Sequence, residues 1–137
     1  MAKWRWRLDE IGTAAVEFAI LAPTMILTPY IMAQICLTIW QWNTLQQVAN
    51  LTARCAALGS TACASVTTGC TSSDAAVCYA ETTAKAYGVS NVQDSDVEVD
   101  HNQSLNSVSF TTVTIKRSTT IVGQTFALCS SASFPNN

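Results

Sequence analysis

The amino-acid sequence predicts an α+β chain: a long N-terminal transmembrane helix, then a small disulfide-stapled domain with one helix and a short antiparallel β-meander. Three observations lead to this prediction. The run from Phe18 to Trp40 contains no Asp, Glu, Lys, Arg or His. Five of the six cysteines lie beyond that run. From Asn91 onward, apolar and polar residues alternate, a spacing typical of half-buried strands.

The apolar run is long enough to cross a membrane. As a helix it covers roughly 34 Å, and a hydrocarbon core is about 30 Å thick. Lys3, Arg5 and Arg7 precede the run, and the next basic residue is Arg54. Because basic flanks stay in the cytoplasm, we expect a single-pass inner-membrane protein with its N-terminus inside and residues 59–137 exported. The run ends in WQWN, which lacks the small-residue cleavage site of a secretory signal, so we expect it to be retained.

Helix signals divide the chain into three parts: a charged leader (1–12), a transmembrane helix (13–58) and an exported α+β domain (59–137). Gly59 is the expected stop of the first helix. Past the membrane, one face of this helix should pack on the exported domain through Leu45, Val48, Thr52, Cys55 and Leu58. A second helix, capped by Ser73 or Asp74, should run to about Tyr87 with a buried stripe of Ala76, Tyr79, Ala80, Thr83 and Tyr87.

The alternating pattern predicts three strands. The first contains Val97 and Val99, the second spans about 108–116, and the third runs from Thr119 to Phe126. The segment 101–106 is expected to be the turn between the first two strands. The tail, 130–137, is expected to be loose apart from any tether at Cys129.

The cysteines suggest disulfides rather than a metal site. Cys36 lies inside the apolar run, where we expect a reduced, apolar filler. The other five lie on the expected exported side, where disulfides persist: Cys55, Cys63, Cys70, Cys78 and Cys129. Five is odd, so at most two bridges form within one chain, and one thiol is free or pairs between chains. Their connectivity stays open. None of their spacings is the C-x-x-C of a zinc site or a thiol oxidoreductase, so no metal is expected.

No catalytic residues or cofactor are expected. The only histidine, His101, falls in the expected turn, and the sequence contains no G-x-S-x-G motif, Gly-rich phosphate loop or paired His ligands. After Asn43 there are four basic and six acidic residues, which gives no reason to expect nucleic acid as a partner. The sequence therefore favours a protein that is not an enzyme.

Glu17 is unusual for a simple anchor because it directly precedes the apolar run. A carboxylate near hydrocarbon costs several kcal/mol unless it is paired, so an acid here indicates a functional site. Thr24 and Thr28 lie on the same helix stripe. Small residues on a neighbouring face allow another helix to approach closely: Ala15, Ala19 and Ala22. The alternative is that Glu17 only extends to the membrane interface.

The stretch GTAAVEF at residues 12–18 resembles the prepilin cleavage and assembly signature of type IV pilin-like proteins. More closely, GTAAVEFAILAP, followed by LTARCAALG, is similar to the TadE-like pseudopilins of the tight-adherence (Tad/Flp) pilus. The resemblance covers residues 12–59. It implies that a prepilin peptidase cuts between Gly12 and Thr13, which places Glu17 fifth in the mature chain. Thr13 at the first mature position and the additional Pro29 depart from the pattern.

The resemblance implies a role for these residues. Glu17 would pair with the new ammonium at Thr13 of a neighbouring subunit, and this pairing would set the register of the helices. The expected function is that of a minor pilin or pseudopilin in the assembly of an adhesive pilus. Its partners would be other pilin subunits, through the N-terminal helix, as well as the peptidase and the bacterial inner membrane, and the subunit would also occur in a surface pilus. The alternative is an uncleaved membrane-tethered adhesin or pilus assembly factor.

Overall fold

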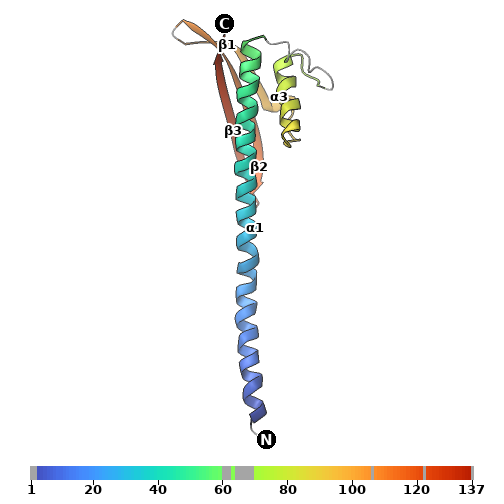
Figure 1. The fold of residues 1–137 in the computed structure, drawn as a ribbon, viewed down its shortest axis with the longest axis vertical. Helices are drawn as coiled ribbons and strands as arrows, with labels where there is room; N and C mark the ends of the chain where they lie inside the picture. The colour runs from blue at the N-terminus through green and yellow to red at the C-terminus, as the bar shows by residue number, and fades with distance from the viewer. Residues whose placement is uncertain (1–2, 60–62, 64–69, 106, 122, 137) are drawn as a thin grey trace. The chain divides into compact units, whose positions relative to one another are not determined.

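The computed structural model describes residues 3–59, 63, 70–105, 107–121 and 123–136, with the side chains of residues 3–11 and 105 left out. The chain forms two compact units, Met1–Leu37 and Thr38–Asn137, and each is described by itself. The elements are α1 (Lys3–Ala57), α3 (Ala75–Ala86), the short 3-10 helix η1 (Asp94–Asp96), β1 (Val97–Leu105), β2 (Val108–Ile121) and β3 (Gln124–Pro135) (Figure 1).

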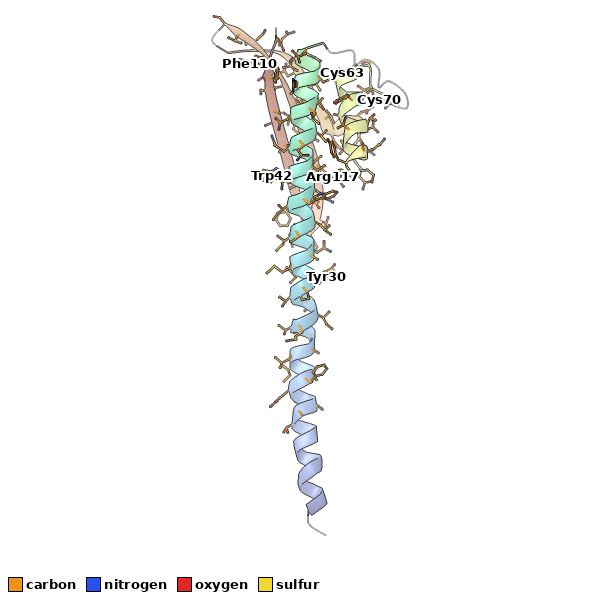
Figure 2. All side chains as sticks on the ribbon, viewed as in Figure 1. Tyr30, Trp42, Cys63, Cys70, Phe110 and Arg117 are labelled. Carbon is orange, nitrogen blue, oxygen red and sulfur yellow. A yellow bond between two sulfur atoms is a disulfide. The ribbon has the colours of Figure 1, made fainter. Side chains whose placement is uncertain are left out.

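The first unit consists of the N-terminal part of α1. This helix begins ten residues before the expected Thr13 and continues through Pro23 and Pro29. Apolar side chains project on both sides of the ribbon (Figure 2), and Phe18 and Met25 are 73% and 75% exposed. Within the described residues, one helical segment, Gly12–Ala57, is long and apolar enough to cross a membrane. An apolar surface of this kind requires lipid or other helices around it.

The second unit buries one face of α1 against the sheet and α3. Four of the five residues expected on this face are buried: Leu45, Val48, Thr52 and Cys55. The expectation for Leu58 was wrong, because it is 46% exposed. It follows the last helical residue, Ala57, so it no longer keeps the helical phase. Ala49 and Ala53 complete the buried face and let the neighbouring elements approach the helix closely.

The second helix, α3, is capped as the sequence predicted. Asp74 accepts a hydrogen bond from the Ala76 amide, and Gly88, at φ +84°, follows the last turn. The expected buried stripe was partly wrong, since Tyr87 is 46% exposed. The stripe is rotated, because the core side is formed by Ala76, Val77, Cys78, Ala80 and Ala84.

The three strands form an antiparallel meander in the order β1-β2-β3. Along β2 the buried side chains are Thr111, Val113 and Ile115, and these meet the buried face of α1 in one core. The expected loose tail was wrong: residues up to Pro135 belong to β3, and Ser130 and Ala132 are buried. The expected turn at 101–106 was also wrong over most of its length, because β1 extends to Leu105. A bulge between Asp100 and Gln103 accommodates the polar residues there.

Two disulfides join elements of the second unit. Cys55 near the end of α1 is bonded to Cys63, and Cys70 is bonded to Cys78 in α3, with Cα–Cα separations of 5.9 and 5.5 Å. Cys36 and Cys129 are free and exposed. Both bridges therefore hold the ends of the segment between α1 and α3, and Cys129 provides no tether for β3.

Candidate functional site

The motif residues Gly12, Thr13 and Glu17 lie on one exposed face of α1. Together with Val16 they line a shallow surface depression in the first unit. Thr13 and Glu17 are four residues apart, a spacing that places two side chains on the same side of a helix. The side chain of Glu17 is therefore one helical turn from Thr13, on the same side of the helix.

Gly12 has no packing role among the described residues. A Cβ atom at this position would meet nothing within 4 Å, and the backbone there is helical. Glycine inside a helix costs about 1 kcal/mol relative to alanine. Tertiary packing does not compensate for this cost, so the structure gives no folding reason for glycine at position 12.

Glu17 is surrounded by apolar side chains. Val16 and Phe18 are 61% and 73% exposed, and Ile20 and Leu21 follow them into the apolar run. The described side chains include no hydrogen-bond or ion-pair partner for the Glu17 carboxylate.

Thr28, on the polar stripe beyond Glu17, is satisfied within α1. Its hydroxyl donates to the backbone oxygen of Thr24 at 2.8 Å. Such a bond satisfies the hydroxyl in a membrane without a partner helix.

Two half-exposed tryptophans occur where α1 enters the second unit. The indole of Trp40 lies over Gly88, where an added Cβ would be 3.4 Å from its Cη2. The Trp42 Nε1–H donates to the backbone oxygen of Cys129 at 3.4 Å. Their exposed fractions are 47% and 48%. These side chains therefore have packing roles in the second unit.

Gln46 attaches α1 to β3. Its Nε2 donates to the backbone oxygen of Ser131 at 3.0 Å, and its Oε1 accepts from the hydroxyl of Ser130 at 2.6 Å. Ser130 is only 1% exposed. Sequence reasoning missed this pair because glutamine and serine carry no signal for a contact 84 residues apart.

One group of potential metal-ligating atoms lies in the second unit: Cys70, Glu81 and Asp94, with ligand atoms within 4.8 Å of one another. Cys70 is bonded to Cys78, so it offers no thiolate, and Glu81 forms an ion pair with Lys85. The Thr71 hydroxyl donates to Asp94 at 2.5 Å and, as the largest influence, lowers the pKa of that carboxyl. These interactions fix the segment between Cys70 and α3 to η1, and they do not form a metal site.

His101 lies in the bulged part of β1 instead of a turn. Its Nε2 is 2.9 Å from a carboxylate oxygen of Asp74, the residue that caps α3. Its backbone oxygen accepts from the side chain of Asn136 at 2.8 Å. His101 therefore joins β1, α3 and the end of the chain, which is a structural role.

The sites named from the sequence do not form one constellation. Gly12, Thr13 and Glu17 belong to the first unit, and the four bridged cysteines belong to the second. The start of the apolar helix is thus the candidate site, and the disulfides belong to the second unit.

Comparison with known proteins supports the motif. A family model described as TadE-like protein matches residues 12–54. No curated protein and no solved structure matches the chain. The matched segment starts at Gly12, contains Glu17 and the apolar run, and ends before the first bridged cysteine. The resemblance drawn from the sequence is therefore confirmed: residues 12–54 of this chain are similar to the TadE-like family.

Proposed function

We propose that the chain is a minor pilin or pseudopilin that takes part in assembling a Tad/Flp-type adhesive pilus. The observation that carries the proposal is the pair Gly12 and Glu17 at the start of an apolar helix within the TadE-like segment. Gly12 lowers helix stability with no packing reason, as a residue kept for recognition by a peptidase would do.

Cleavage after Gly12 would give Thr13 a free amine. In a membrane or filament core, this ammonium and the Glu17 carboxylate of a neighbouring subunit would form an ion pair, which would lower the desolvation free energy of each charge. The pairing fixes how far one helix is displaced along the next. Small side chains at 15 and 19 allow the close approach that such a contact needs. The partners are other pilin subunits and the prepilin peptidase. The basic flank predicts that the N-terminus is cytoplasmic and the second unit is exported.

The unbroken helix across Gly12 and Thr13 favours a second candidate, a membrane-tethered adhesin or assembly factor that keeps its leader. A peptide bond inside a regular helix must unwind before a peptidase can cleave it. N-terminal sequencing of the protein from its native membrane separates the two candidates. A processed pilin begins at Thr13, and a chain that begins at Met1 in cells with active prepilin peptidase supports the second candidate.

Two substitutions test the roles of the motif residues. Gly12→Leu removes the glycine and favours the helix, so we expect stable membrane insertion without processing. Glu17→Gln keeps the size of the side chain and removes the charge. We expect insertion and cleavage to continue, with at least a tenfold loss of the subunit from purified pili. Thr24→Val is the matched control on the same stripe. Normal incorporation of Glu17→Gln would refute the charge-pairing mechanism.

A further inference from the structure

The β2–β3 hairpin extends beyond the three-stranded part of the sheet. β1 pairs with β2 only as far as Val97 opposite Ile115, whereas β2 and β3 stay paired to Ile121 opposite Gln124. We call residues 116–121 and 123–128 the hairpin extension. Its two segments, KRSTTI and GQTFAL, contain two basic residues and no acidic one.

This extension lies at the end of the second unit where α1 enters. Trp42 donates to the Cys129 oxygen, and Gln46 donates to the Ser131 oxygen. From Trp42 to Gln46 the helix rises about 6 Å, and from Cys129 to Ser131 the strand rises about 6.6 Å. The two contacts therefore follow one another in the same order, and α1 and β3 run in the same direction. Within the second unit, the β3 residues that precede Cys129 therefore lie toward Thr38, the first residue of this unit (α1 and β3 are labelled in Figure 1). The covalent bond before Thr38 joins this end to the apolar run.

One face of the extension combines apolar side chains with a cation. Residues 117, 119 and 121 share the face of Val113 and Ile115 by the two-residue period of a strand. Across the ladder, Arg117 is opposite Leu128, and Thr119 is opposite Phe126. Phe126 is 50% exposed, so the core does not cover this face.

The positive charge of Arg117 is not neutralised within the described part of the chain. Its Nη1 is buried without a hydrogen-bond partner, and no carboxylate there forms an ion pair with it. By contrast, the neighbouring Lys116 is on the other face and pairs with Glu98 at 2.7 Å. Arg117 as a whole is only half-buried, so the part of its guanidinium that stays accessible can donate to phosphate oxygens.

We propose that the hairpin extension, with Trp40 and Trp42, rests on the phospholipid headgroups of the membrane that α1 crosses. The two indoles and Phe126 lie at the boundary between headgroups and acyl chains, where aromatic rings are stable. Arg117 binds the phosphate of an anionic phospholipid. This contact limits how the second unit tilts on its helix. The inference rests on membrane insertion of the apolar run and is independent of leader cleavage and filament assembly.

Spin-label accessibility in the full chain tests the contact. The chain, with Cys36→Ser and Cys129→Ser, is reconstituted in vesicles of phosphatidylcholine, with or without phosphatidylglycerol. A label on Gln124→Cys, opposite Ile121 and so on the face of Arg117 and Phe126, reports the extension, and a label on Ser109→Cys reports the opposite end of β2. We expect the Gln124 label to be several-fold less accessible to a water-soluble nickel complex and more accessible to oxygen. Equal accessibility of the two labels would overturn the proposal.

Two further variants identify the interaction. Arg117→Gln should reduce protection of the Gln124 label mainly in vesicles that contain phosphatidylglycerol, whereas Phe126→Ser should reduce it in both vesicle types. Arg54→Gln removes the same charge from the last turn of α1 and should leave the protection unchanged. Circular dichroism confirms that each variant is folded. If protection rises with the protein-to-lipid ratio, a second copy of this chain covers the extension, and the lipid assignment is wrong.

Discussion

Replacing Gln46 by methionine removes the polar attachment between α1 and β3 and keeps the size of the side chain. The carboxamide makes two hydrogen bonds, one to the Ser131 oxygen and one from the Ser130 hydroxyl. Each is worth about 0.5–1.5 kcal/mol net, and a buried hydroxyl left without a partner costs about 1–3 kcal/mol. Because Ser130 is 1% exposed, water cannot replace the lost acceptor. We therefore expect Gln46→Met to destabilise the second unit by about 2–3 kcal/mol.

The assay is thermal unfolding of the full chain in detergent micelles with its disulfides intact, followed by near-UV circular dichroism. A loss of 2 kcal/mol should lower the Tm by about 8–16 °C for a unit of this size. Gln47→Met is the matched control, because Gln47 is the adjacent glutamine and is exposed.

A double-mutant cycle with Ser130→Ala separates the hydrogen bonds from general packing. Ser130→Ala alone should cost about 1 kcal/mol, since the half-buried Gln46 can still reach water. The double variant lacks the buried, unpaired hydroxyl, so its cost should be smaller than the sum of the two single costs. If Gln46→Met and Gln47→Met unfold within about 0.5 kcal/mol of each other, the reasoning is wrong.

Three other predictions concern the second unit. Thiol counting on the denatured, unreduced chain should find two thiols, and six after reduction; any other count contradicts the observed bridges. Gly88→Ala, at φ +84° and under Trp40, should cost about 1–2 kcal/mol. Gly59→Ala also has positive φ and should cost about as much, since an added Cβ at position 88 would be in ordinary contact with Trp40; an unchanged Tm in either variant would contradict the backbone argument. The pKa of Asp94 is lowered when folded, so its stabilisation is present above the unfolded pKa and is lost as the pH falls through the folded pKa. NMR titration of Thr71→Val should show a higher Asp94 pKa, and an unchanged value would refute the assigned cause.

Local sequence signals were sufficient for the elements whose chemistry is local. The Asp74 cap and Gly88 end of α3 follow from short-range backbone requirements, and the apolar run follows from composition. The residues that recur every three or four positions in α1 correctly predicted its buried face as far as Cys55. These signals could not locate the limits of α1, because nothing between Lys3 and Thr13 breaks a helix and the leader continues it.

The errors share one cause, which is burial supplied by distant elements. The segment after Cys129 is rich in serine and reads as a loose tail, yet Ser130 is buried because Gln46 satisfies its hydroxyl. Tyr87 reads as a core residue but is exposed, since small alanines let α3 approach its neighbours on another face. A polar residue can be buried only where a specific hydrogen-bond partner exists, and the residues around it in the sequence do not show where that partner is.

By itself, the sequence determined the membrane segment, the TadE-like motif and the capacity for two disulfides, because hydrophobic length, glycine–glutamate spacing and cysteine number are properties of the chain. Only the tertiary structure decided which cysteines pair and that Cys129 is free. It also decided that the serine-rich tail forms β3, because the alignment of α1 with the sheet sets which polar groups find partners. The same alignment puts Arg117 and Phe126 toward the Thr38 end of the second unit, a position that no local pattern encodes.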